Sequence, residues 1–268
     1  YHQVVRSQML RYKRQQSPKG WADLHKLLAH YFVHLRDELG MENEEARTDD
    51  TWQRYELERL YHGLCGAPKK ELPAALNGFL VALKAEGAFA RRWAEVIEQA
   101  GEESGSAAVS VWGKKLMAGR KAREERRYEE VTAMYSELVE YPQLEKAWRV
   151  EAFARRGVTY YVMEEYEQAL ADFNQALALE PSLDWAIASR AQVYYVLGCL
   201  DKALADFDQA LALDPDLDWA IASRGETYRR MGRYEEALTD FDRAVDLDPD
   251  HAWAIASRGQ VHQALGQY

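Results

Sequence analysis

The sequence predicts an all-α fold, a superhelical solenoid of stacked helical hairpins preceded by a helical module. The segment Trp-Ala-Ile-Ala-Ser-Arg occurs at 185–190, 219–224 and 253–258, so it recurs every 34 residues. Within each period, apolar residues recur at intervals of three and four, which is the spacing of one face of an α-helix. Glycine and proline also return at fixed places. A fixed period of this length indicates stacked supersecondary units rather than one closed core.

The period 219–252 shows why each unit is expected to be a hairpin. Ile221 and Gly225 fall on one face of a first helix, and Gly232 can end it because glycine readily adopts a left-handed backbone. A second amphipathic helix follows, and Pro249 ends it because proline cannot continue the helical hydrogen bonding. Small residues at regular spacing in both helices predict a close antiparallel approach.

This pattern resembles the tetratricopeptide repeat (TPR) family. The period 219–252 carries the family's skeleton of small and aromatic residues as Gly225, Tyr228, Gly232, Tyr234, Ala237, Phe241, Ala244 and Pro249. The two earlier periods match with few departures, among them Glu164 where the turn glycine is expected. The resemblance implies a protein-recognition scaffold whose first helices border a concave groove.

The length of the chain allows a solenoid with an attached module. We expect a helical module at 1–111, a degenerate TPR-like hairpin at 112–150 and the TPR solenoid at 151–268. The solenoid divides into 151–184, 185–218, 219–252 and a truncated repeat at 253–268. Within the module, Pro73 and Gly101 are expected to break helices, and Gly101 to Ser110 is interpreted as a linker or loop. The chain starts inside an amphipathic pattern and stops inside a repeat, so we expect a fragment of a longer protein.

The amino-terminal stretch resembles a second kind of protein. Residues 1–20, which open with Tyr-His-Gln-Val-Val-Arg, are similar to the end of the winged helix in signalling NTPases of the STAND class, and 21–32 to the helical arm that follows. The resemblance implies the sensor arm of a larger bacterial regulator, for example in defence signalling, with His2 as a nucleotide-sensing candidate in the parent protein. Gln3 stands where many relatives have Asp, and no phosphate-binding loop occurs. The alternative is a free-standing TPR adaptor or assembly factor.

Composition excludes several classes of function. The net charge of −10 argues against nucleic-acid binding, and no apolar run approaches membrane-spanning length. Cys65 and Cys199 are far apart and unpatterned, which favours free thiols in a reducing compartment, the cytoplasm.

Catalytic motifs are missing, so no enzyme, no cofactor and no metal are predicted. The weaker alternative is a metal-dependent enzyme that uses His30 and His34, which are four residues apart and can share a helical face. Such a pair binds zinc only with a third ligand, which the sequence does not supply in a recognisable motif.

Aromatic and charged residues return with the period of the repeats. The candidate partner-binding residues are Trp185, Trp219, Tyr195, Glu226, Arg229 and Arg230. The two tryptophans are interpreted as apolar anchors in the groove, and packing between adjacent hairpins is the competing interpretation. Periodic Arg and Asp residues are interpreted as structural pairs between first and second helices.

The resemblance also excludes one ligand and suggests a contact between copies. Chaperone-tail binding in the family needs Lys and Asn on successive first helices, and this chain has Ala154, Val158, Ser189, Trp219 and Ser223 there. We therefore expect a different protein or peptide partner. At the truncated end, the residues expected to lack a covering helix are Trp253, Ile255, Val261 and Leu265. An exposed apolar face of this kind favours self-association.

Overall fold

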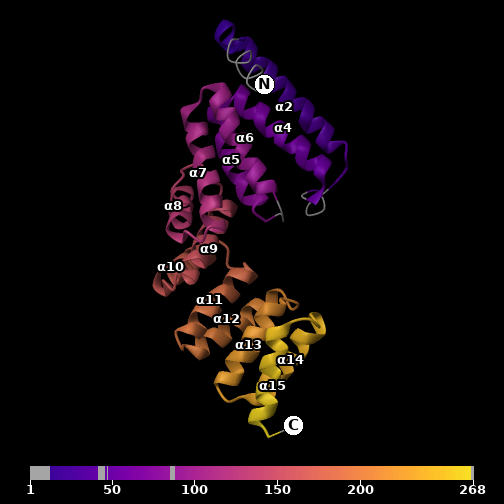
Figure 1. Ribbon diagram of the computed structural model, residues 1–268, viewed down its shortest axis with the longest axis vertical. Coiled ribbons are helices and arrows are strands. Elements are labelled where there is room, and N and C mark those ends of the chain that lie inside the picture. The colour runs from indigo at the N-terminus through magenta and orange to yellow at the C-terminus, as the bar shows by residue number, and fades with distance from the viewer. Residues whose placement is uncertain (1–12, 42–45, 47, 85–87, 267–268) are drawn as a thin grey trace. The chain divides into compact units, whose positions relative to one another are not determined.

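The structure is a computed structural model that describes residues 13–41, 46, 48–84 and 88–266 (Figure 1). All regular secondary structure in these residues is helical, which confirms the all-α prediction. The helices are α2 (Pro18–Asp37), α4 (Asp50–Gly66), α5 (Pro68–Ala82), α6 (Phe89–Ser104), α7 (Ala107–Glu124), α8 (Tyr128–Val139), α9 (Lys146–Val162), α10 (Tyr166–Leu179), α11 (Asp184–Val196), α12 (Leu200–Leu213), α13 (Asp218–Arg230), α14 (Tyr234–Leu247) and α15 (Ala252–Ala264). Within the described ranges, no helix is both long enough and apolar enough to cross a membrane.

The chain forms two compact units, Tyr1–Trp148 and Arg149–Tyr268. In the amino-terminal unit, α4 packs against α2 and α6, and α6 packs against α7. Two expectations for this unit were wrong. Pro73 lies inside α5, and α6 continues through Gly101 to Ser104. A Cβ atom on Gly101 would lie 2.2 Å from the backbone nitrogen of Ser110, so this glycine permits the close approach of α6 and α7 instead of ending a helix.

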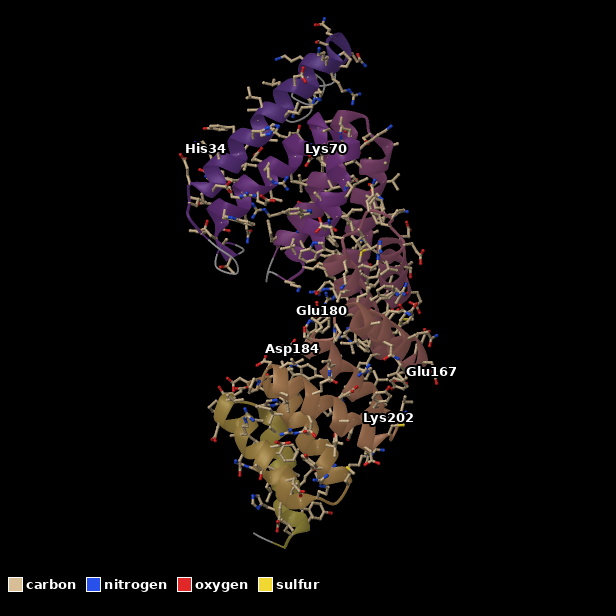
Figure 2. All side chains as sticks on the ribbon, turned by 180° about the vertical axis from the view of Figure 1, so that it is seen from behind. His34, Lys70, Glu167, Glu180, Asp184 and Lys202 are labelled. Atoms are coloured by element: carbon tan, nitrogen blue, oxygen red, sulfur yellow. The ribbon has the colours of Figure 1, made fainter. Side chains whose placement is uncertain are left out.

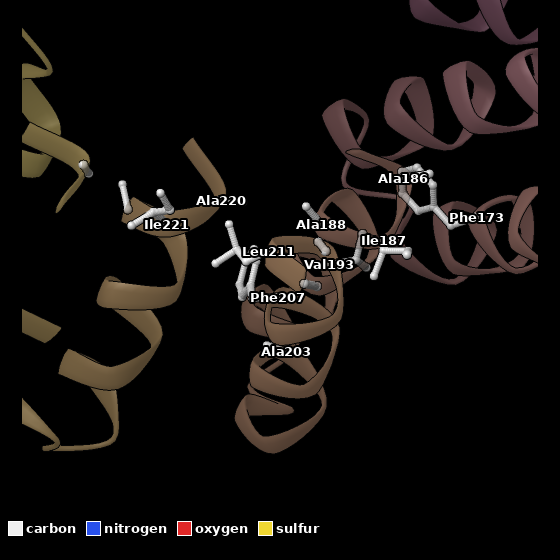
Figure 3. Close-up of a cluster of buried hydrophobic side chains, with 14 of the residues drawn as sticks. Phe173, Ala186, Ile187, Ala188, Val193, Ala203, Phe207, Leu211, Ala220 and Ile221 are labelled. Atoms are coloured by element: carbon white, nitrogen blue, oxygen red, sulfur yellow. The ribbon is translucent and has the colours of Figure 1, made fainter. Parts of the chain in front are cut away.

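The carboxyl-terminal unit, which we call the repeat unit, contains α9 to α15 as successive first and second helices of hairpins. Each complete repeat places one phenylalanine of its second helix in a fully buried position, at Phe173, Phe207 and Phe241. Figure 3 shows alanine, isoleucine and valine side chains of α11 and α13 in the same continuous core. Gly225 faces Phe241, because a Cβ there would lie 3.1 Å from the phenylalanine ring. The small residue therefore lets the two helices of the hairpin pack closely.

The predicted Arg and Asp pairs are confirmed. Within each complete repeat, the guanidinium of the first helix donates two hydrogen bonds to one carboxylate of the second helix, at 2.7–2.9 Å, in the pairs Arg156–Asp172, Arg190–Asp206 and Arg224–Asp240. All three aspartates are buried. A third guanidinium nitrogen reaches the preceding repeat, from Arg190 to Asn174 at 2.8 Å and from Arg224 to Asp208 at 2.6 Å. The arginine thus ties each hairpin together and ties it to its neighbour.

The hairpin turns share one backbone geometry. Gly198 and Gly232 have φ of 76°, and Glu164 occupies the corresponding place with φ of 61°, although it has a side chain. In the amino-terminal unit, Arg126 takes the same place between α7 and α8, with φ of 57°. The amide after each of these residues donates to a carbonyl five residues back, for example Arg127 to Ala122 at 2.8 Å. On this basis we propose that α7 and α8 form a degenerate repeat, which is the predicted hairpin within 112–150.

A pair of histidines lies in the amino-terminal unit, with His25 buried and His62 half-buried. The Nδ1 atoms of His25 and His62 are 2.8 Å apart, so one ring donates and the other accepts. His25 is 4% exposed, and its ring centroid lies 4.1 Å from that of Trp21, with the two rings tilted by 47°. Burial lowers the pKa of His25 to about 4. Its neutral form is therefore the one that the fold accommodates.

Replacing Arg224 with Met should destabilise the repeat unit by about 3 kcal/mol, because it leaves the buried carboxylate of Asp240 without its partner. The free energy of unfolding in urea measures this. Arg258→Met is the matched control, since Arg258 makes one hydrogen bond, to the exposed Asp242 at 2.9 Å. The control should lose less than about 1 kcal/mol. Equal losses in both variants would contradict a structural role for the buried pair.

The amino-terminal unit should lose stability as the pH falls from 6.5 towards 4. Because the pKa of His25 is about 4 in the folded state and 6.5 ordinarily, the unfolded chain binds the proton first, and folding loses roughly 2 kcal/mol by pH 4.5. Urea unfolding followed by tryptophan fluorescence at pH 7 and pH 4.5 measures the loss. His25→Gln should reduce this pH dependence, whereas His34→Gln, on the exposed side of α2, should leave it as in the parent. Identical pH profiles of parent and His25→Gln would refute the assignment.

Candidate functional site

A cavity of about 370 Å³ lies within the repeat unit, on the side formed by the first helices. The cavity is lined by residues of α9, α11, α13 and α15 and by the ring of Phe173 from α10. The lining residues are Val158, Tyr161, Phe173, Ser189, Gln192, Trp219, Ser223 and Trp253. We call this cavity the groove. Because successive first helices each contribute to it, the groove exists only when the hairpins are stacked.

None of the lining side chains carries a charge. Val158 is 37% exposed and Trp253 is 45% exposed, so apolar surface lies open to solvent in this place. The hydroxyl group of Ser189 donates within its own helix, to the carbonyl oxygen of Trp185 at 2.7 Å. The side-chain amide of Gln192 has no hydrogen-bond partner among the described residues. The groove therefore offers apolar contact area together with one uncommitted amide, which can both donate and accept.

The two predicted anchors differ in their positions. Trp219 lines the groove and is half-buried, whereas Trp185, also half-buried, is not among the lining residues. The third tryptophan of the period, Trp253, lines the groove and meets Phe241 edge-to-face at 6.5 Å between ring centroids. The indoles are thus partly covered by neighbouring helices and partly open. The role of Trp185 and Trp219 as anchors stays a prediction.

The four predicted polar residues form one cluster on α11 and α13. The carboxylate of Glu226 accepts from the hydroxyl of Tyr195 at 3.2 Å and from the guanidinium of Arg229 at 2.6 Å. Arg230 donates to the backbone carbonyl of Tyr195 at 3.0 Å, and its guanidinium lies 5.1 Å from the centroid of the Tyr195 ring. Burial raises the pKa of Tyr195, and the nearby Glu226 raises it further. Within the cluster, Glu226 and Arg229 neutralise each other, and none of the four residues lines the groove.

The histidine candidates lie elsewhere. His30 and His34 are exposed on α2, where the Nδ1 of His30 is 2.7 Å from the carbonyl of Lys26 and the Nε2 of His34 is 3.2 Å from Glu38. Figure 2 shows His34 at the outer surface of its helix. Over the parts of the chain that the structure describes, no three His, Cys, Asp or Glu residues come together as a metal site. His2 lies outside the described residues, so its nucleotide-sensing role remains a sequence-based prediction.

Sequence reasoning missed several lining residues, although the period could have found them. Trp219 lines the groove as predicted, and Val158, Ser189 and Ser223 line it too, although the sequence had identified these three positions only to exclude chaperone-tail binding. Gln192 lies 34 residues after Val158, so one period added to a known groove position predicts it. Tyr161 follows one helical turn after Val158 on the same face.

Family models match the repeat unit. A model described as tetratricopeptide repeat matches residues 150–183 and 185–217, and one described as TPR repeat matches residues 225–266. The first two segments each span most or all of one hairpin, α9 with α10 and α11 with α12, and the third spans the end of α13 together with α14 and α15. The chain therefore carries tetratricopeptide repeats over these segments. Among curated proteins, none matches the sequence.

Solved structures show the same fold. MamA from Desulfovibrio magneticus RS-1 is similar with a TM-score of 0.52 at 18% identity, over 58% of this chain and 86% of that one. YrrB, described as a TPR protein with an unusual peptide-binding site, has a TM-score of 0.50 at 21% identity, over 86% of this chain and 99% of that one. Another crystal structure of MamA has a TM-score of 0.50 at 18% identity, over 56% and 85%. At these identities the likeness supports the fold alone.

Proposed function

We propose that the repeat unit is a protein-recognition scaffold and that the groove binds a segment of a partner protein. The observation that carries the proposal is an apolar, uncharged cavity of about 370 Å³ to which four successive first helices contribute. Its volume is in the range of binding pockets for ligands and single anchor side chains. The related fold of YrrB, a protein described as having a peptide-binding site, is compatible with this proposal.

The chemistry of the groove selects an uncharged, apolar segment. An anionic chain end would lose its hydration in the groove and find no cation there, so it would bind at a net cost. An aromatic or branched aliphatic side chain gains the full burial of its surface between Trp219 and Val158. The amide of Gln192 can then pair with a peptide group of the bound segment. Trp219 is the anchor that we favour, because the largest apolar side chains contribute most at such centres.

The polar cluster of Tyr195, Glu226, Arg229 and Arg230 has a supporting role in this proposal. Two of its hydrogen bonds, from Tyr195 to Glu226 and from Arg230 to the carbonyl of Tyr195, join α11 to α13, and these helices supply half of the lining residues of the groove. Arg230 is exposed and can also contact the rim of a bound segment.

The wider context of this scaffold is a further part of the proposal. The amino-terminal resemblance supports the sensor or partner-recognition arm of a STAND-type NTPase regulator in the bacterial cytoplasm. A free-standing TPR adaptor is the alternative, and a phosphate-binding loop encoded upstream of Tyr1 in the gene distinguishes the two. The weaker alternative, a metal-dependent enzyme at His30 and His34, has less support, because His30 Nδ1 already contacts its own helix backbone.

The last part of the proposal is that the chain self-associates through α15. Trp253, Ile255 and Leu265 are 45%, 40% and 39% exposed, so an apolar face is available to a second copy. The expectation for Val261 was wrong, because this side chain is fully buried within the repeat unit. Sedimentation at high protein concentration measures the association, which we expect to be weak.

A phage-displayed peptide library tests the groove. Selection on the full chain should enrich peptides with aromatic or aliphatic anchors and without acidic carboxyl termini. For a selected synthetic peptide, Gln192→Trp should weaken binding at least tenfold, because the indole fills the groove without removing an internal hydrogen bond. Trp219→Ala should cost about 2 kcal/mol of binding free energy. Fluorescence polarisation measures both.

The matched control is Gln209→Trp, which adds the same side chain on an exposed position of α12 outside the groove. It should bind the peptide as the parent does. Enrichment of acidic carboxyl termini, or undiminished binding by Gln192→Trp, would refute the groove as the site.

A further inference from the structure

A second cavity, of about 440 Å³, lies in the amino-terminal unit, and we call it the α2–α4 cavity. Its walls come from α2, from the residues just before α2, and from α4. The two helices pack side by side (Figure 1). The lining includes Trp21, Leu24, His25, Leu28, Tyr61 and His62. A volume of this size is typical of a pocket for a small molecule.

The hydrogen bond between the two lining histidines determines which ring nitrogens carry protons. The Nε2 atom of His62 lies 3.7 Å from the carboxylate of Glu58, which favours a proton on that nitrogen. In the neutral pair, His62 therefore accepts at Nδ1, and His25 donates from its own Nδ1. The Nε2 atom of His25 then carries a lone pair and acts as an acceptor. No described residue donates to it.

The indole of Trp21 supplies the complementary group. Trp21 is 7% exposed, and its Nε1 atom is buried and donates to no described atom. Because the Trp21 and His25 ring centroids are 4.1 Å apart, an unmet donor and an unmet acceptor lie on neighbouring side chains of one cavity. Buried polar groups without a partner are costly. A ligand group that pairs with both nitrogens is therefore strongly favoured here.

The remaining surface of the cavity is aromatic and aliphatic. The hydroxyl of Tyr61 donates to the carboxylate of Glu103, so Tyr61 presents its ring to the cavity and not a free hydroxyl. That ring lies 5.8 Å from the His25 ring, between centroids. The side chains of Leu24 and Leu28 complete the apolar surface. Surfaces of this kind favour a flat aromatic body.

We propose that the α2–α4 cavity is a binding site for a small aromatic alcohol of the phenol or naphthol class. One hydroxyl group satisfies both nitrogens, because it donates to Nε2 of His25 and accepts from Nε1 of Trp21. The ring packs against Tyr61. A carboxylate is a poorer ligand, because it has no proton to donate to His25 and the lining cation, Lys13, is exposed to solvent. This site lies in the amino-terminal unit and is distinct from the groove.

Three matched ligands test the proposal on the full chain by equilibrium dialysis at neutral pH. The first is 2-naphthol, and the second is 2-methylnaphthalene, which has a similar size but neither donates nor accepts. The third is 2-naphthoate, which is an anionic acceptor. We expect 2-naphthol to bind at least tenfold more tightly than either of the others. Gln192→Trp, which fills the groove of the repeat unit, should bind 2-naphthol as the parent does.

Two substitutions locate the hydroxyl group. His25→Asn keeps an amide near the position of Nδ1 and removes the Nε2 acceptor, and Trp21→Phe keeps a ring and removes the indole N–H. Each should weaken 2-naphthol at least tenfold and leave 2-methylnaphthalene nearly unchanged. Trp52→Phe is the matched control, because Trp52 lies on α4 and does not line the cavity. It should bind 2-naphthol as the parent does. Thermal melting confirms that the variants are folded.

Nitrogen NMR of the histidine rings in the parent chain needs no substitution in the cavity. It should show the Nδ1–H tautomer for His25 and the Nε2–H tautomer for His62, and 2-naphthol should shift the Nε2 signal of His25. The opposite tautomers would overturn the proposal. So would equal affinity for 2-naphthol and 2-methylnaphthalene, or the absence of any binding by 2-naphthol. Tighter binding of 2-naphthoate would also overturn it and assign the cavity to anions held by Lys13.

Discussion

The buried pairing of a guanidinium with a carboxylate is the interaction on which the repeat unit depends. A buried aspartate is tolerable only when it is paired, and the planar guanidinium donates both of its hydrogen bonds to the carboxylate in one orientation. Each pair, such as Arg190 with Asp206, therefore fixes both the separation and the register of two antiparallel helices. The contact of Phe241 with Gly225 fixes the same register through the apolar core. These pairs help to fix the positions of α9, α11 and α13, which supply most of the lining of the groove.

The same pairing explains why the groove is neutral. The repeat unit is rich in arginine and acidic residues, but many of these residues form ion pairs with one another, as Arg224 does with Asp240 and Arg229 with Glu226. The inner surface is therefore lined by apolar side chains and an amide group. A scaffold of this design recognises shape and apolar area, and it discriminates against charged segments by the cost of desolvating them.

The fold was predictable because its determinants repeat. A period of 34 residues, turn glycines and paired Arg and Asp positions all report local geometry that each repeat forms anew. The groove was predictable only in part: Trp219 was identified, whereas Gln192 and Trp253 were not. Gln192 could have been found by adding one period to Val158. Which of the other periodic residues line the groove depends on how successive hairpins rotate against one another, and a single period does not determine that rotation. Gly101 was misinterpreted for a related reason, since a glycine that ends a helix and one that admits a neighbouring helix look alike in sequence.

The junctions between repeats differ in the charge of the group that accepts the hydrogen bond. Arg190 reaches back to the neutral amide of Asn174, whereas Arg224 and Arg258 reach back to the carboxylates of Asp208 and Asp242. Dissolved salt screens attraction between opposite charges at an exposed site and leaves a neutral hydrogen bond nearly unaffected. Ionic strength therefore acts unevenly along the stack: it loosens the later two junctions and spares the first. Fraying in concentrated salt would start at the carboxyl-terminal end and stop at the hairpin formed by α11 and α12, which stays joined to α10.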